Sequence, residues 1–121
     1  MKIRKEQMQA FSEALEEAFV QRMVRHLRRG FSAQLAAQGL YEADLCPLVR
    51  RGISRAKAYG VVCEGALEQY LEYMVLLGLD FDRDKRIPWA SELLHRQDTD
   101  GGRKMAQIAA HLTFSPEGLL Q

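Results

Sequence analysis

Hydrophobic residues recur at steps of three and four along most of this chain, which is the spacing of amphipathic helices. The first such stripe begins at Met8 and continues through Phe19 to Leu27. Acidic residues are frequent early in this segment and basic residues gather at its end, an order that complements a helix dipole. The pattern predicts a long amphipathic helix, closed by Gly30.

Later segments carry the signals that begin and end helices. Asp44 is expected to cap the third helix, because this start leaves Pro47 in the first turn, where its missing N–H costs little. Gly52 and Ala56 in that helix are small residues one turn apart, which allows a neighbouring helix to approach closely. We see no strand pattern and no repeat. The sequence predicts one all-α domain over residues 1–121, a bundle of five or six helices at about 4–29, 33–38, 45–59, 64–77, 89–96 and 102–112.

The helix predicted at residues 64–77 is apolar on more than one side, and an aspartate-rich turn and Trp89 follow it. Such a helix is either buried centrally or docked against another chain. Aromatic residues are common anchors where proteins bind one another. Under the second alternative, the predicted partner-binding residues are Tyr70, Tyr73, Phe81, Asp82 and Trp89.

The turn itself alternates Asp80, Asp82 and Asp84, as the start of a calcium-binding loop does. The match then fails, because Lys85 stands where such a loop needs glycine and Ser91 where it needs a bidentate glutamate. We therefore expect these carboxylates to cap the next segment or to pair with nearby arginines. The sequence predicts no metal site.

Catalytic chemistry has no recognisable pattern either. The three histidines, His26, His95 and His111, lie far apart in the sequence and lack neighbouring ligands. Cys46 and Cys63 have apolar neighbours, which predicts reduced, buried thiols. We expect no catalytic residues and no cofactor.

Composition narrows the class of protein further. The chain has 121 residues, of which 47% are hydrophobic, and a net charge of +1. It can therefore bury a substantial core, and its charge does not favour nucleic acid as a partner. The N-terminus leads into a charged amphipathic segment, and the longest apolar run is too short to cross a bilayer. We expect a cytoplasmic protein without a membrane segment.

The chain carries several short motifs made of apolar positions and turn residues: Met1–Met8, Arg51-Gly52-Ile53, Ala56, Ala58-Tyr59-Gly60-Val61, Tyr70-Leu71, Gly78-Leu79-Asp80-Phe81-Asp82 and Pro88-Trp89-Ala90. Together these motifs resemble those of small bacterial proteins encoded beside effectors and their adaptor chaperones in type VI secretion clusters. The resemblance covers most of residues 1–96.

The resemblance implies a co-chaperone or adaptor that helps an effector to reach the secretion spike. Its partner would be another protein: an effector, a spike-tip protein or an adaptor chaperone. A second copy of the chain, forming a homodimer, is also compatible with the apolar fourth helix. The alternative function is a cytoplasmic immunity protein that binds and blocks a toxin, and an enzyme is the third class.

Overall fold

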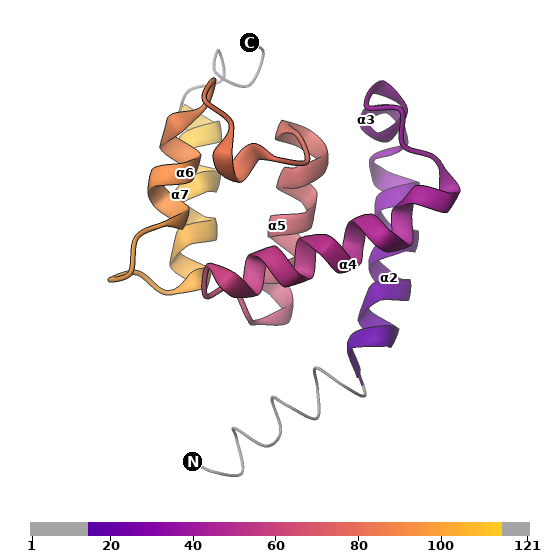
Figure 1. The fold of residues 1–121 in the computed structure, drawn as a ribbon, viewed down its shortest axis with the longest axis horizontal. Helices are drawn as coiled ribbons and strands as arrows, with labels where there is room; N and C mark the ends of the chain where they lie inside the picture. Colours follow the sequence, from indigo (N-terminus) through magenta and orange to yellow (C-terminus); the bar gives the residue numbers. More distant parts are fainter. Residues whose placement is uncertain (1–14, 115–121) are drawn as a thin grey trace. The chain divides into compact units, whose positions relative to one another are not determined.

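The fold is all-α, as predicted. The computed structural model describes residues 15–114, and within this range it contains no β-strand (Figure 1). The α-helices are α2 (Glu16–Gly30), α3 (Ser32–Ala37), α4 (Glu42–Ala58), α5 (Glu64–Leu77), α6 (Pro88–Leu94) and α7 (Gly101–Phe114), and a 3-10 turn, η2, covers Phe81–Arg83. The first part of the predicted helix 4–29 lies outside the described residues.

Close contacts divide the chain into two compact units, one ending at Arg50 and the other beginning at Arg51. The boundary falls within α4, so this helix contributes residues to both units. The sequence-based expectation of one domain stays a prediction.

The first unit contains α2, α3 and the beginning of α4. The inward stripe of α2 includes Phe19, Met23 and Leu27, which are almost completely buried. Two exposed ion pairs join α2 to α4: Arg28 to Glu42 at 2.8 Å and Arg50 to Glu17 at 2.6 Å. Exposed pairs of this kind add little stability, so the unit depends mainly on its apolar stripe.

The start of α4 differs from the prediction. Asp44 is not the N-cap but lies within the first turn, where its carboxylate accepts a hydrogen bond from the backbone N–H of Tyr41 at 2.8 Å. This is one half of a capping box, in which an acidic residue reaches back to the residue that precedes the helix. The helix therefore begins at Glu42, and Pro47 lies inside it.

The second unit contains the rest of α4 together with α5, η2, α6 and α7, of which α6 and α7 lie side by side (Figure 1). The remainder of α4 approaches α5 closely at Gly52. A Cβ atom on Gly52 would lie 2.6 Å from the sulfur of Met74, so only glycine fits without a shift of α5 side chains. The small residue predicted to permit a close helix contact does so here.

The first turn of α7 packs against the backbone that follows α4. A Cβ atom on Gly101 would lie 2.6 Å from the Cα of Val61 and 2.9 Å from the carbonyl carbon of Gly60. Both are backbone atoms, which cannot rotate away as a side chain can. Gly102, the next residue, is exposed, and a Cβ there would meet only a carboxylate oxygen of Asp100 at 3.4 Å.

Gly101→Ala is therefore expected to lower the free energy of unfolding by about 1–3 kcal/mol, the usual cost of forcing extra atoms into a packed site. Gly102→Ala is the matched control, because it makes the same change in helix propensity one residue away without the backbone clash. Urea denaturation of both variants measures the difference. Equal stability of the two variants would contradict this packing.

Candidate partner-binding surface

The segment between α5 and α6, Gly78–Ile87, is referred to here as the exit turn. Gly78 ends α5 with φ +124°, a backbone conformation that residues with a side chain rarely adopt. Its carbonyl then accepts the N–H of Phe81 at 3.0 Å, which begins η2. The chain reverses within a few residues, and Pro88 occupies the first position of α6.

A buried carboxylate ties the exit turn to α4. Asp82 is completely buried, and its Oδ2 accepts a hydrogen bond of 2.6 Å from the hydroxyl of Tyr59. The guanidinium of Arg55 lies 3.4 Å from Oδ1 of Asp82 and also donates to Oδ1 of Asp80 at 2.6 Å and to the carbonyl of Leu79 at 3.3 Å. One arginine thus bonds three residues of the turn, and its charge-assisted hydrogen bonds to the carboxylates are of the stronger kind.

The ionisable groups around Asp82 are not poised for proton transfer near neutral pH. Burial, and then the hydrogen bond to Asp82, raises the pKa of Tyr59 from 10.0 to about 12. Burial likewise raises the pKa of Tyr70, whose hydroxyl is buried without a hydrogen-bond partner in the described structure. The hydrogen bond to Asp80 raises the pKa of Arg55. These groups keep their charge states at physiological pH, so their arrangement is structural.

The raised pKa of Tyr59 predicts a loss of stability in alkali. Folding holds the proton on Tyr59 up to about pH 12, whereas the unfolded chain releases it near pH 10. Stability is therefore complete below about pH 10 and falls as the pH rises towards 12. Urea denaturation at several pH values across this range measures the slope, which should be shallower in Tyr59→Phe. An equal slope in both proteins would contradict the assignment.

The third aspartate of the turn also has a cationic partner. Asp84 accepts hydrogen bonds from the side chain and backbone N–H of Arg86, with a shortest side-chain distance of 2.8 Å, and these bonds lower the pKa of Asp84. Arg55 engages the other two carboxylates. The structure thus confirms one of the two roles expected for these aspartates, which is pairing with nearby arginines.

The predicted contact residues are mostly interior. Tyr70, Phe81 and Asp82 are fully buried, and Tyr73 is 7% exposed. Trp89 is partly exposed and stacks on the ring of His111 with centroids 4.2 Å apart. Four of the five residues therefore lie in the core around α5, which corresponds to the alternative of central burial, and their role in partner binding stays a prediction.

Phe81 shows why these aromatic side chains are buried. Its ring lies 5.1 Å from that of Tyr70 and 6.4 Å from that of Tyr73, measured between centroids. The Tyr73 hydroxyl in turn donates to the carbonyl of Met105 on α7 at 3.3 Å. The aromatic side chains thus connect η2, α5 and α7, and their packing holds the exit turn against the core of the second unit.

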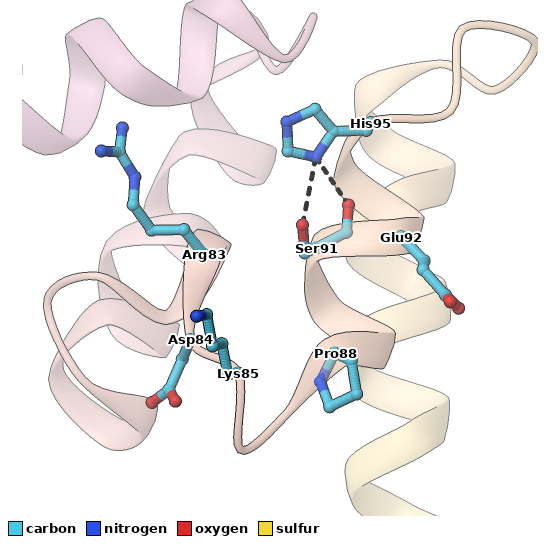
Figure 2. Close-up of a pocket in the computed structure, with 7 residues that line it drawn as sticks. All are labelled: Arg83, Asp84, Lys85, Pro88, Ser91, Glu92 and His95. Atoms are coloured by element: carbon cyan, nitrogen blue, oxygen red, sulfur yellow. Dashed lines mark hydrogen bonds between the residues drawn. The ribbon is translucent and has the colours of Figure 1, made fainter.

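A groove of about 380 Å³ lies between the exit turn and α6 and is referred to here as the exit groove (Figure 2). Its turn side carries the exposed cations Arg83 and Lys85. Pro88, Ser91, Glu92 and His95 line the α6 side, and Asp84 completes the lining. Sequence reasoning missed this groove, because only the short turn brings Arg83 and Lys85 next to α6.

Ser91 and His95 in the exit groove lie one helical turn apart. Nδ1 of His95 is 2.8 Å from the backbone carbonyl of Ser91 and 3.3 Å from its hydroxyl (Figure 2). The shorter contact requires a proton on Nδ1, and a protonated Nδ1 cannot accept the serine proton. His95 therefore does not activate Ser91 through this nitrogen.

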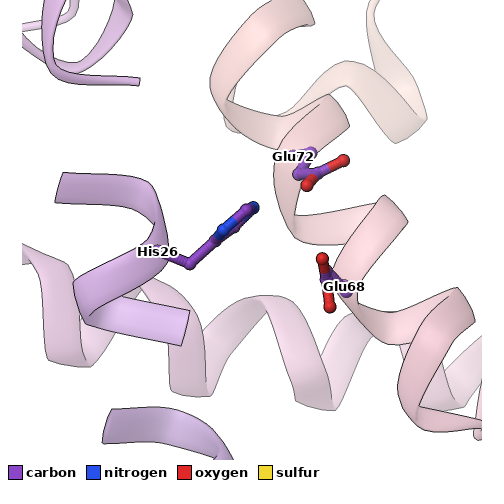
Figure 3. Close-up of side chains that lie close together, drawn as sticks. All are labelled: His26, Glu68 and Glu72. Carbon is purple, nitrogen blue, oxygen red and sulfur yellow. The ribbon is translucent and has the colours of Figure 1, made fainter. Parts of the chain in front are cut away.

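Two further carboxylates project from successive turns of α5, those of Glu68 and Glu72 (Figure 3). Carboxylates spaced four residues apart share one face of a helix. His26, which Figure 3 also labels, belongs to α2 in the first unit, where its ring lies 5.8 Å from that of Phe31. The glutamates are half-buried residues of a helix face.

Both cysteines are free thiols, but their positions differ from the prediction. Cys46 is half-buried, whereas Cys63 is exposed at the start of α5. Cys63 provides no side-chain cap, yet α5 still begins at Glu64, since the backbone carbonyl of Cys63 accepts the N–H of Leu67 at 2.8 Å. The expectation of a buried thiol is wrong for Cys63.

Comparisons of the chain with protein-family models, curated proteins and solved structures gave no match. None of the helices described in residues 15–114 is long and apolar enough to cross a membrane.

Proposed function

We propose that this chain is a non-catalytic, cytoplasmic protein that binds another protein, as a co-chaperone or adaptor for loading a type VI secretion effector. The secretion role follows from the resemblance of its motifs to small proteins encoded in such clusters. The partner is an effector, a spike-tip protein or an adaptor chaperone. The structure of the exit turn supports the binding role independently of this resemblance.

The observation that carries the proposal is the rigid attachment of the exit turn. Arg55 on α4 and Tyr59, the residue after α4, hold the turn, and Phe81 anchors it between Tyr70 and Tyr73. A turn fixed in this way loses little conformational entropy when a partner binds, and such preorganisation favours affinity. The exit groove beside it offers exposed cations next to the apolar surface of Pro88.

The charges of the exit turn suit an acidic partner. Asp80 and Asp82 share Arg55, and Asp84 is held by Arg86, so each of the three carboxylates has a cationic partner. Lys85 has no ion-pair partner among the described residues, and Arg83 is exposed. Complementary charge around a binding site accelerates association and disfavours wrong partners.

An immunity protein is the alternative, because a rigid turn can equally block a toxin. Co-expression with the products of neighbouring genes distinguishes the two roles. A stable complex with a spike-tip protein, an adaptor chaperone or an effector that stays active supports the adaptor. A complex that abolishes the activity of a toxic domain supports immunity. If the protein binds none of these products and remains a monomer, both proposals fail.

A further inference from the structure

Lys104 is a buried cation that the proposed protein-binding role does not use. It lies in the first turn of α7 with only 4% of its surface exposed. Its ammonium donates to the backbone carbonyl of Leu94 at 2.7 Å and to that of Tyr59 at 2.8 Å. These carbonyls lie at the C-terminal ends of α6 and α4, where helices carry partial negative charge. Lys104 is therefore held in one position by two helix ends.

These two hydrogen bonds leave the ammonium incompletely satisfied. A lysine ammonium has three N–H donors, and two of them have acceptors. No carboxylate of the described residues lies within ion-pair distance of Lys104. Burial lowers the pKa of Lys104, while the charge of Asp98 acts in the opposite direction. A buried cation with a remaining donor and no paired anion is stabilised by a negatively charged ligand.

The space beside Lys104 is large enough for such a ligand. A crevice of about 370 Å³ is lined by Lys104, Gly60, Arg96 and Thr99, with His95 at the side that it shares with the exit groove. Pockets for small ligands begin at about 300 Å³. The lining contains no carboxylate among the described residues, and the Arg96 side chain is exposed without an ion-pair partner there. The cationic side chains of Lys104 on α7 and of Arg96 in the segment after α6 thus both line the crevice.

We propose that this crevice binds a small oxyanion, with Lys104 as the fixed buried cation and Arg96 as the exposed one. The ligand is a phosphate or carboxylate group small enough for the crevice. Arg96 offers a planar set of donors that suits either group, and Lys104 contributes a point charge at the base. This site is independent of the proposed protein partner, because none of the cations on the exit turn contributes to it.

The test is a titration of the ¹⁵N-labelled protein with inorganic phosphate and, separately, with acetate, followed by amide chemical shifts. Saturable shifts at Gly60 and Thr99 with either anion are expected, and the anion that binds identifies the chemical group. Arg96→Gln should weaken binding about tenfold, as the loss of one charge-assisted hydrogen bond does. Lys104→Met should abolish binding.

Arg103→Gln is the matched control, since Arg103 is an exposed arginine on α7 outside the crevice and its variant should bind like the wild type. Lys104→Met also removes two structural hydrogen bonds, so Arg96→Gln decides the outcome if the lysine variant does not fold. The absence of saturable shifts with both anions, or equal weakening by Arg96→Gln and Arg103→Gln, would overturn the proposal.

Discussion

Replacing Phe81 with alanine is expected to lower the free energy of unfolding by about 3–5 kcal/mol, the usual cost of removing a fully buried aromatic ring. Phe81 has no exposed surface and packs against Tyr70 and Tyr73. Its loss leaves a cavity beneath the exit turn, between η2 and α5. Urea denaturation followed by far-UV circular dichroism measures the effect.

Trp89→Ala is the control for this substitution. Trp89 is partly exposed, and its main ring contact is the stacked His111, which is itself exposed. A stacked pair of this type contributes about 1 kcal/mol beyond its buried area, so the loss should be clearly smaller than for Phe81→Ala. A Phe81→Ala protein as stable as the wild type, or less affected than Trp89→Ala, would show that Phe81 is not the anchor of the turn.

Asp82→Ala should have the second-largest effect, lowering the free energy of unfolding by about 2–3 kcal/mol. The substitution removes the acceptor of the Tyr59 hydroxyl and one partner of Arg55, both through charge-assisted hydrogen bonds. The Tyr59 hydroxyl is then left without this acceptor in a partly buried site. Asp82→Asn keeps an acceptor oxygen of similar shape and should lose less. Urea denaturation of both variants measures the two losses.

Asp80→Ala provides the matched comparison, because Asp80 also pairs with Arg55 but has 67% of its side chain exposed. Exposed ion pairs contribute less than about 1 kcal/mol. The two aspartates should therefore differ clearly in effect although they share one arginine. Equal losses in Asp80→Ala and Asp82→Ala would mean that burial of Asp82 does not strengthen its interactions.

Helix locations could be predicted from the sequence because hydrophobic spacing and glycine stops act locally. The helix predicted at residues 64–77 has those bounds in the structure. The start of α4 was misplaced by a few residues, since an aspartate three positions into a helix gives the same sequence signal as an N-cap. Capping geometry, rather than residue type, distinguishes the two positions.

The interior of the second unit was harder to predict, because it depends on contacts between distant residues. Arg55 and Tyr59 reach Asp82 across more than twenty positions, and nothing in the local sequence links them. The many apolar positions of α5 were compatible both with central burial and with binding to a partner. Asp82 would be expected at the surface on residue type alone, yet it is fully buried and bonded to Tyr59 and Arg55.

Lys104 illustrates the same limit for the candidate ligand site. It follows Gly101, Gly102 and Arg103 in a stretch that reads as the exposed start of a helix. Its burial arises because the ends of α4 and α6 meet over the first turn of α7, where Gly101 permits a close approach. A sequence pattern cannot show that two helix ends converge on one side chain.

The most direct test of the central claim is the affinity of the co-purified partner for a variant of the exit turn, measured by isothermal titration calorimetry. Arg83→Glu with Lys85→Glu reverses two exposed charges beside the exit groove, and Arg103→Glu reverses an exposed charge on α7. Because Arg83 also lies 3.9 Å from Asp82, the double variant should lose some thermal stability but stay folded at the assay temperature. We predict that it weakens binding at least tenfold and that Arg103→Glu binds like the wild type. Wild-type affinity of the double variant would contradict the exit turn as the binding surface.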